Sequence, residues 1–294
     1  MKKRLIIDTD PNIHVRGRDI DDALAILFCI ASPEVEVEGI TVNFGNVKAP
    51  VGYGAARDIL RAAGADVPVM QGAASSADLG GGNEAVDFLV RSVKENPGEI
   101  SLLALAPLTN VASACMLDEG FASGLRELVV MGGTLDFWIF KYLGEFNLHQ
   151  DARAAATVLS QPIAKTLITM DVCAQAVFAR EHLDRLRAAG SEVSRLCADF
   201  VAPWLKLNRV VFWRKKGFFP WDVVAASYLV DPTLFEDSPH TFQVVEEGLR
   251  RGRLRDVKRA GGFQGTNGKR PVNMPLELDG ERFMDLFLAR LLRL

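Results

Sequence analysis

The sequence predicts an α/β fold: an open, mostly parallel sheet flanked by helices, with a helical elaboration late in the chain. Short apolar runs rich in β-branched residues alternate with helical patterns along most of the 294 residues, as in successive β-α-β units. Several of these runs are apolar throughout, as expected for strands covered on both faces. No linker, repeat or low-complexity tract interrupts the pattern, so we expect a single domain over residues 1–294.

The first part of the chain supplies the clearest alternation of strands and helices. Gly64 ends one predicted helix, Pro97 and Gly98 close the next, and Pro107 begins a third, as is common at helix boundaries. The predicted strands cover 4–8, 35–43, 67–70 and 99–105, and the helices between and after them cover 21–32, 49–64, 83–98 and 107–117.

The later part of the chain continues this alternation and then becomes mainly helical. The predicted elements are a strand over 126–133, a helix over 151–160 and a strand over 163–169. Helical patterns dominate from about 180 to 230, and 241–278 is predicted to form strands joined by a loose loop at 259–270. An amphipathic helix over 280–292 closes the chain.

Composition excludes several classes of protein. The net charge of −3 argues against a surface made mainly for nucleic acid. The apolar run near the N-terminus is too short for a signal peptide, and no segment has the ~20 apolar residues that a membrane span needs. The cysteines form no CxxC pair and sit among apolar neighbours, so we interpret them as reduced core thiols of a cytoplasmic protein. They are Cys29, Cys115, Cys173 and Cys197.

Aspartates crowd the junction between the first strand and the first helix. The five are Asp8, Asp10, Asp19, Asp21 and Asp22. Ligands of open α/β sheets bind beyond the carboxyl ends of the strands, and carboxylates are also common in the first turn of a helix. Capping explains one or two of these residues, but five clustered carboxylates repel each other and need a counter-charge. We therefore favour a site for a hard divalent cation, which prefers oxygen ligands.

Two kinds of enzyme carry such aspartates. The "DTD" at 8–10 has the DxD form of haloacid-dehalogenase-type phosphatases, in which the first Asp, here Asp8, is a nucleophile and the metal is magnesium. That interpretation leaves Asp21 and Asp22 unexplained. The longer pattern "DTDP…DIDDALAI" more closely resembles the amino-terminal signature of the inosine–uridine-preferring nucleoside hydrolase family.

Further motifs that resemble this family follow in the family's order and span nearly the whole chain. Five ordered motifs are far more specific than any one of them. After the first come "GITVNFGNVKA" at 39–49, "LALAPLTNVA" at 103–112, "VVMGG" followed by "GEFNLHQDARAA" at 144–155, and "PWDVVAASYLVDP" at 220–232.

The resemblance implies calcium-dependent hydrolysis of the N-glycosidic bond of ribonucleosides, which gives ribose and the free base. Asp10 would be the catalytic base as well as a metal ligand, and Asp8 would support the cluster. The implied calcium ligands are Asp10, Asp22, the Leu105 carbonyl and Asp222. The implied substrate-binding residues are Asp21, Asn46, Glu145, Asn147 and Trp221. The resemblance also implies a homodimer or homotetramer.

Trp221 stands where many relatives have a histidine that protonates the departing base. A Trp side chain cannot act as a general acid, but it can stack on a base, and purine-preferring members of the family have Trp at this position. The alternative is that Trp221 begins a helix and packs in the core. We favour stacking on the base because Trp221 adjoins Asp222.

Other departures from the family pattern indicate a modified substrate range. A polar insertion at 12–18 replaces the family's short Gly segment and is either a lid over an unusual base or 5′ substituent, or a neutral surface insertion. An Asn that contacts the 5′ hydroxyl aligns with Ile139, so we expect that contact to be lost. We give His149 a structural role. The remaining alternative function is a non-catalytic binder of ribosyl ligands that kept the metal cage.

Overall fold

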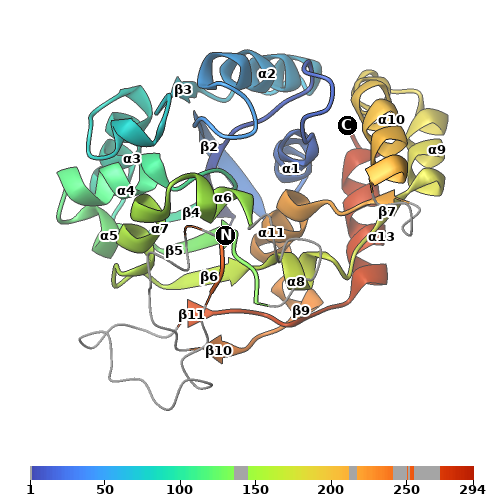
Figure 1. The fold of residues 1–294 in the computed structure, drawn as a ribbon. Helices are drawn as coiled ribbons and strands as arrows, with labels where there is room; N and C mark the ends of the chain where they lie inside the picture. Colours follow the sequence, from blue (N-terminus) through green and yellow to red (C-terminus); the bar gives the residue numbers. More distant parts are fainter. Residues whose placement is uncertain (1, 136–144, 212–216, 241–249, 251, 255–271) are drawn as a thin grey trace.

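A single open sheet forms the centre of the protein (Figure 1). The computed structural model describes residues 2–135, 145–211, 217–240, 250, 252–254 and 272–294. The strand order is β10-β11-β6-β5-β4-β1-β2-β3, and all neighbours are parallel except β10 and β11. The predicted α/β class is therefore confirmed. The strands are β1 (Lys3–Thr9), β2 (Val35–Val42), β3 (Val69–Gln71), β4 (Ile100–Ala104), β5 (Glu127–Met131), β6 (Lys165–Ile168), β10 (Pro239–His240) and β11 (Val272–Asn273).

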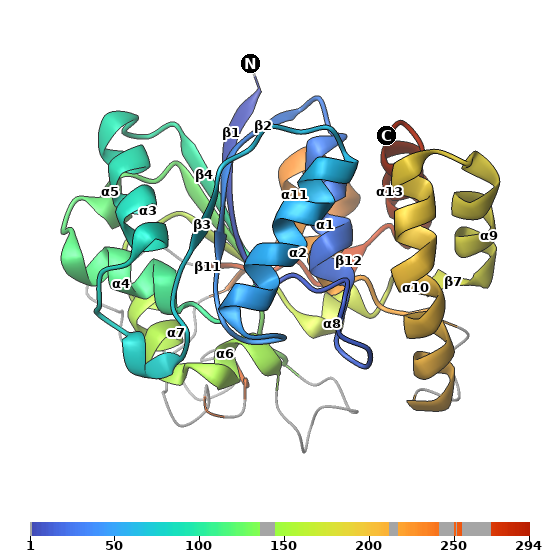
Figure 2. The ribbon, with the colours of Figure 1, turned by 90° about the horizontal axis from the view of Figure 1, so that it is seen from above.

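Successive residues of the central strand β1 point into two separate cores, because side chains alternate across a strand. Leu5 and Ile7 belong to one buried cluster and Ile6 to the other, and all three are fully buried. Helices cover both faces of the sheet (Figure 2). One face carries α1 (Asp21–Ile30), α2 (Ala49–Ala62) and α11 (Trp221–Val230); the other carries α3 (Glu84–Glu95), α4 (Thr109–Leu117), α5 (Phe121–Gly124) and α7 (Ala152–Leu159).

Local signals in the sequence set several helix ends. Asn83 caps α3 by accepting the Val86 N–H, and α2 has a proline in its first turn. Gly64 follows α2 with φ +63°, a conformation that glycine adopts without the steric cost of a Cβ. Aspartates 151 and 279 cap α7 and α13 (Gly280–Leu291) in the same way as Asn83.

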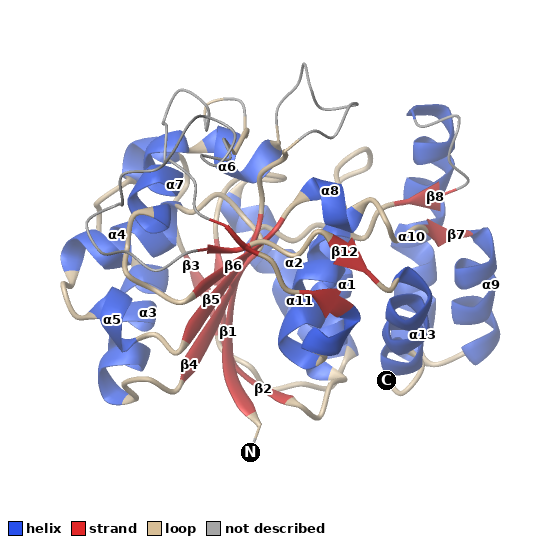
Figure 3. Cartoon of the chain, turned by 90° about the horizontal axis from the view of Figure 1, so that it is seen from below, coloured by secondary structure: helices blue, strands red, loops and turns tan. Residues whose placement is uncertain are grey.

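A helical layer lies beyond α1 and α11, as the late helical pattern predicted. It contains α9 (Arg180–Ala189), α10 (Glu192–Val211) and α13 (Figure 2). The short strands β7 (Phe178–Ala179) and β8 (Gly217–Phe218) pair antiparallel beside α10 (Figure 3), a pairing the sequence did not predict. The smaller elements are α6 (Phe146–Gln150), α8 (Met170–Cys173), β9 (Phe235–Glu236) and β12 (Glu277–Leu278).

Three further predictions from the sequence concern membrane spans, the loop at 259–270 and the number of domains. No helix among the described residues is long and apolar enough to cross a membrane. The predicted loose loop at 259–270 lies outside the described residues. The single-domain organisation over 1–294 stays a prediction.

Aromatic side chains join the helical layer to the sheet-bound helix that carries Asp21 and Asp22. Phe287 of α13 packs edge-on against Phe28 of α1, with ring centroids 6.1 Å apart. The same ring lies 6.0 Å from Phe178, which stacks on Phe218 at 5.1 Å. Phe287 therefore links α13 to α1 and to β7.

Phe287→Ala should destabilise the protein by about 3–5 kcal/mol, because it leaves a cavity at this junction. Chemical denaturation measures the change in the free energy of unfolding. Leu117→Ala is the control, since Leu117 is 54% exposed and its truncation should change stability by less than about 0.5 kcal/mol. Equal effects of the two substitutions would contradict the role given to the aromatic cluster.

Candidate active site

The strand order places a topological switch point at the middle of the sheet. From β1 the chain proceeds to β2 and β3 on one side, and then returns to β4, β5 and β6 on the other. In open α/β sheets a crevice forms outside the carboxyl ends of the strands at such a point. Asp10 follows β1, Asn46 follows β2 and Leu105 follows β4. The fold thus gathers residues from three of the predicted motifs.

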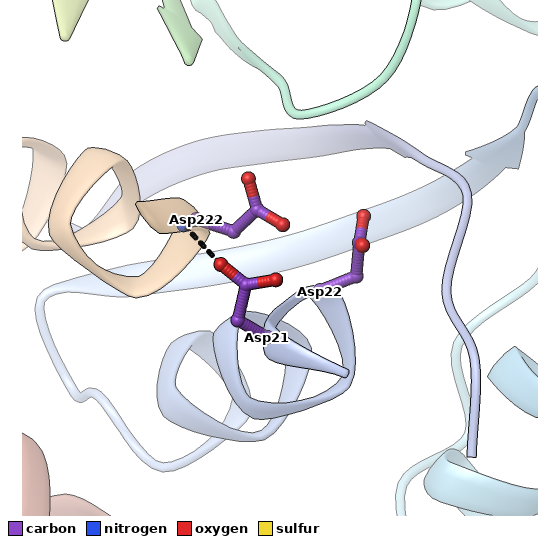
Figure 4. A group of neighbouring side chains, drawn as sticks. All are labelled: Asp21, Asp22 and Asp222. Carbon is purple, nitrogen blue, oxygen red and sulfur yellow. Dashed lines mark hydrogen bonds between the residues drawn. The ribbon is translucent and has the colours of Figure 1, made fainter. Parts of the chain in front are cut away.

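Three aspartates from two helix N-termini meet in this crevice (Figure 4). Asp21 and Asp22 begin α1, and Asp222 lies in the first turn of α11. The Asp222 N–H donates a hydrogen bond to Asp21 Oδ2 at 3.0 Å. One carboxylate oxygen from each of the three lies within 4.8 Å of the other two, and all three residues are buried. We call this group the aspartate cluster.

Asp10 is held beside this cluster by backbone groups. Its Oδ2 accepts the Asn46 N–H at 2.5 Å, and its own N–H donates to Asp22 Oδ1 at 3.2 Å. The hydroxyl of Thr9 also donates to Asp22 Oδ1, at 2.5 Å. Gly45 has φ +151°, and a Cβ built there would collide with Asp10 Oδ2. The "GN" motif at 45–46 therefore positions one carboxylate.

Asp8 lies below the cluster, fully buried at the end of β1. Its Oδ1 accepts hydrogen bonds from Thr41 Oγ1 at 2.6 Å and from Asn110 Nδ2 at 2.8 Å. Its Oδ2 is buried without a hydrogen-bond partner. Burial raises the pKa of Asp8 to about 6, so the acid form fits the orphaned oxygen. This arrangement suits the predicted supporting role.

The electrostatics of the site call for a cation. Burial, reinforced by neighbouring carboxylates, raises the pKa values of Asp10, Asp21 and Asp222 well above the ordinary range. Burial likewise raises the pKa of Asp22. Within the described part of the chain no ion pair joins any of these carboxylates to a basic side chain. A divalent ion with oxygen ligands would remove the repulsion, so the donor set fits a metal.

A cavity of about 360 Å³ opens onto the aspartate cluster. Asn147 lines it beside the cluster and donates through Nδ2 to the carbonyls of Leu105, at 2.8 Å, and Met131, at 3.2 Å. Glu145 also lines the cavity, and its two carboxylate oxygens accept the N–H groups of Asn147 and Leu148 as the cap of α6. This end of the cavity is rich in polar atoms.

Four aromatic side chains of the lining, Trp204, Phe218, Phe219 and Trp221, form what we call the aromatic wall of the cavity. The first residue of α11, Trp221, lies with its ring centroid 4.8 Å from that of Phe219. Trp204 and Asn208 of α10 line the same cavity. Sequence reasoning missed Trp204, Asn208, Phe218 and Phe219. Helical periodicity identified α10, but nothing in its sequence indicated which of its faces meets the cavity.

The insertion at 12–18 folds into a loop that is fixed at both ends. Asn12 is fully buried; its Oδ1 accepts the N–H groups of His14 and Val15, and its Nδ2 donates to two carbonyls in the loop. Asn46 Nδ2 donates to the Asp19 carbonyl at 2.8 Å, and its Oδ1 accepts the Asp19 N–H at 3.0 Å. The side chain of Asn46 thus anchors the loop, and the backbone N–H of Asn46 holds the Asp10 carboxylate.

Most of the predicted site residues converge on this cavity. Its lining includes Asp10, Asp21, Asp22, Asn46, Leu105, Glu145, Asn147, Trp221 and Asp222. Asp8 lies beneath the lining. Asp19, which the sequence placed in the acidic group without a role, also lines the cavity. His149 does not, and its Nδ1 instead contacts the Arg250 carbonyl. Ile139 lies outside the described residues.

Comparison with known proteins gives the same assignment. The sequence model of the inosine-uridine preferring nucleoside hydrolase family matches residues 5–285. The chain belongs to this family. The predicted enzyme class, a nucleoside N-ribohydrolase that acts on N-glycosyl bonds, is thereby confirmed.

Individual nucleoside hydrolases resemble the chain along its whole length. Uridine nucleosidase 1 from Arabidopsis thaliana is 29% identical over 332 aligned residues, covering 99% of this chain and 94% of its own. The plant nucleoside hydrolase PpNRh1 has a TM-score of 0.85 at 26% identity, with 99% of both chains covered. A purine-preferring ribonucleoside hydrolase from Gardnerella vaginalis also gives 0.85 at 26% identity, over 99% of this chain and 98% of its own.

The raised pKa values predict how stability depends on pH. A carboxyl whose folded-state pKa lies above its unfolded value stabilises the fold at low pH, and this contribution is lost as pH rises through the folded pKa. Burial raises the pKa of Asp8 from 3.8 to about 6. At ~1.4 kcal/mol per pKa unit, this one group changes the free energy of unfolding by about 3 kcal/mol. Without metal, the melting temperature should therefore fall as the pH rises from about 4 to 6, and Asp10, Asp21 and Asp222, whose pKa values are raised well above the ordinary range, should extend the fall to higher pH.

Calcium should restore the melting temperature more at pH 7 than at pH 5, because protons compete with the ion for the same oxygens. Scanning calorimetry with and without a chelator measures both effects. The matched variant is Asp222→Asn, which removes one buried charge and should flatten the metal-free pH dependence. A metal-free melting temperature that rises over this range, or a calcium effect that does not change with pH, would contradict the account.

Proposed function

We propose that the protein hydrolyses the N-glycosidic bond of ribonucleosides in a calcium-dependent reaction that gives ribose and the free base. The observation that carries this proposal is the buried aspartate cluster of Asp21, Asp22 and Asp222, which opens onto a cavity with a polar and an aromatic end. The polar part of the lining suits the hydroxyl groups of a ribose, and the aromatic part suits the flat ring of a nucleobase. The phosphatase alternative has less support, because the nucleoside hydrolase family model matches residues 5–285, a range that contains the aspartates of the site.

The proposed calcium ligands are Asp10, Asp22, the carbonyl oxygen of Leu105 and Asp222. Calcium accepts six to eight oxygen ligands and tolerates irregular geometry, which suits a set drawn from two loops and two helices. Asp21 lies close enough to Asp22 and Asp222 to share the charge of the ion. When bound, calcium orients the attacking water, lowers its pKa and holds the ribose 2′ and 3′ hydroxyls.

The side chains around the ion would carry out the remaining steps. Asp10 takes the proton of the water, and the Asn46 N–H on its Oδ2 fixes its direction. The ribose gains positive charge as the bond to the base breaks. The buried carboxylates of the cluster stabilise that charge without having to reorient. Asp8 supports the end of β1, just before Asp10, through its hydrogen bonds from Thr41 of β2 and Asn110 of α4.

Ribose recognition is proposed for the polar end of the cavity. Asp21, Asn46, Glu145 and Asn147 line it and offer acceptors and amide donors for hydroxyl groups. Glu145 and Asn147 already bond to backbone groups there. These contacts hold the two side chains in fixed orientations before substrate arrives, which lowers the entropy cost of binding.

Loss of the metal or of its ligands should abolish activity. Asp10→Ala and Asp222→Asn should each remove calcium binding and lower ribose release about 1000-fold or more, because the charge-stabilising site is lost. Asp66→Asn is the control, since Asp66 is exposed and follows the C-terminal end of α2, whereas Asn46 of the site precedes the N-terminal end of that helix. Reducing-sugar release from purine and pyrimidine nucleosides, with and without a chelator, measures activity, and calorimetric titration measures calcium binding.

The chelator experiment also separates the alternatives. Chelator-sensitive ribose release supports the hydrolase. Calcium binding and nucleoside binding without any turnover would instead favour the ribosyl-ligand binder. Full activity in Asp10→Ala would contradict the proposed mechanism.

Trp221 is proposed to stack on the base and to favour purines. Its position at the start of α11, one residue before Asp222, and its place in the cavity lining support this role. The relatives described above include a uridine nucleosidase and a purine-preferring hydrolase. Because these relatives differ in the base they prefer, the base preference of this chain has to be inferred from its own cavity residues.

Trp221→Ala should lower kcat/KM for inosine about tenfold more than for uridine, because a purine offers the larger stacking surface. Trp221→Phe keeps a flat ring and should recover most of the loss. Steady-state kinetics on both nucleosides measures the difference. Equal losses on the two substrates together with a lower melting temperature would indicate a purely structural Trp221.

The proposed enzyme is cytoplasmic, as its scattered, unpaired cysteines indicate, and a homodimer or homotetramer, as the family resemblance implies. Sedimentation equilibrium of the purified chain measures the oligomeric state directly.

A further inference from the structure

One cation lines the nucleoside cavity. Among the described lining residues Arg18 is the only basic side chain, and none of the others is His, Lys, Tyr or Cys. Arg18 forms no ion pair or hydrogen bond with any described residue, even though Asp19 is its neighbour in the chain. It is exposed rather than folded onto the aspartate cluster. An unpaired guanidinium in the lining of a cavity that is otherwise acidic is thus available to a ligand.

The loop that carries Arg18 lies next to the aromatic end of the cavity. A second cavity of about 760 Å³ runs between this loop and α10, and it shares Gly17, Arg18 and Trp204 with the first. Figure 2 shows the dark blue loop before α1 projecting toward α10. Arg18 therefore lines both cavities together with Trp204 of the aromatic wall, while Arg16 of the same loop lines the second cavity alone.

The loop holds its shape through its own hydrogen bonds. Asn12 organises its first half from a fully buried position, and His14 contacts Asp58 of α2 at 3.1 Å. Asn46 bonds to both backbone groups of Asp19, the residue after Arg18. These contacts fix the backbone on either side of Arg18, so its guanidinium is presented to a limited part of the cavity.

In the proposed reaction the departing base gains negative charge, and that charge has to be stabilised where the base binds. When the bond between C1′ and the base nitrogen breaks, its electron pair leaves with the base. The described aromatic wall offers no side chain that can transfer a proton, since Trp and Phe are not acids and Asn208 is an amide. Among the described residues of the lining, a cationic hydrogen-bond donor is what remains to stabilise negative charge on the departing base.

We infer that Arg18 is a catalytic residue that donates hydrogen bonds to the departing base and stabilises its negative charge. The inference rests on the proposed function. The water oxygen forms the new bond to C1′, and one water proton passes to Asp10. The electron pair of the broken bond stays on the base nitrogen, which is held by the guanidinium and takes a proton from solvent on release. Arg18 keeps its own protons, because a guanidinium does not deprotonate in proteins.

The experiment compares two leaving groups in Arg18 variants of the full-length, calcium-loaded enzyme. Uridine and inosine release bases that need stabilisation, whereas p-nitrophenyl β-D-ribofuranoside releases a phenolate that is stable without a donor. Arg18→Ala should lower kcat on the nucleosides about 100-fold, as when one charge-stabilising donor is removed, and lower kcat on the phenyl riboside less than about threefold. Arg18→Lys should recover part of the nucleoside activity, and Arg16→Ala should change neither substrate.

Several results would overturn the inference. They are an equal loss of kcat on both kinds of substrate, no loss on either, or a rise in KM alone. An equal loss in Arg16→Ala and Arg18→Ala would also overturn it, because it would indicate a disturbed loop. The wild-type protein separates this test from that of the proposed function: if it hydrolyses neither nucleosides nor the phenyl riboside, the proposed function itself has failed.

Discussion

The repulsion between buried carboxylates is the constraint on which the rest of the structure depends. Asp10, Asp21, Asp22 and Asp222 are each at least 95% buried, and water cannot screen charges in such a place. Two helix N-termini face the cluster and offset part of its charge. That contribution is small beside the cost of several close anions. A bound cation with oxygen ligands would neutralise the remaining negative charge, and the proposed chemistry requires the same cation.

The fold brings these carboxylates together from distant parts of the sequence. Asp222 follows Asp21 by about two hundred residues, yet its N–H bonds directly to the Asp21 carboxylate. This contact exists because α1 and α11 cover the same face of the sheet at the switch point beside β1. The aromatic junction around Phe287 then ties α1 to the outer helical layer. Aromatic packing therefore connects the helix that carries Asp21 and Asp22 to the outer helical layer.

Much of the fold and of the site could be predicted from the sequence. The residues that could not be predicted depend on tertiary docking or on the path of a loop. Apolar periodicity located the strands and helices, and the motifs named the residues that converge on the cavity, from Asp10 to Asp222. Trp204 and Asn208 could not be found this way, because only the docking of α10 decides which of its faces meets the cavity. The functions of Asn12 and Arg18 depend on the path of the 12–18 insertion, and periodicity does not describe such a path. The grouping of Asp21 with Asp22 and Asp222 is likewise a result of tertiary contact.

The central claim is that the cluster holds a cation against the ribose end of the cavity. Anomalous X-ray scattering from crystals grown with calcium tests it most directly. The account predicts one strong anomalous peak within coordination distance of Asp10, Asp22 and Asp222, at about 2.3–2.6 Å from their oxygens. A cluster without such a peak in calcium-soaked crystals, or a peak held only by surface carboxylates elsewhere, would contradict it.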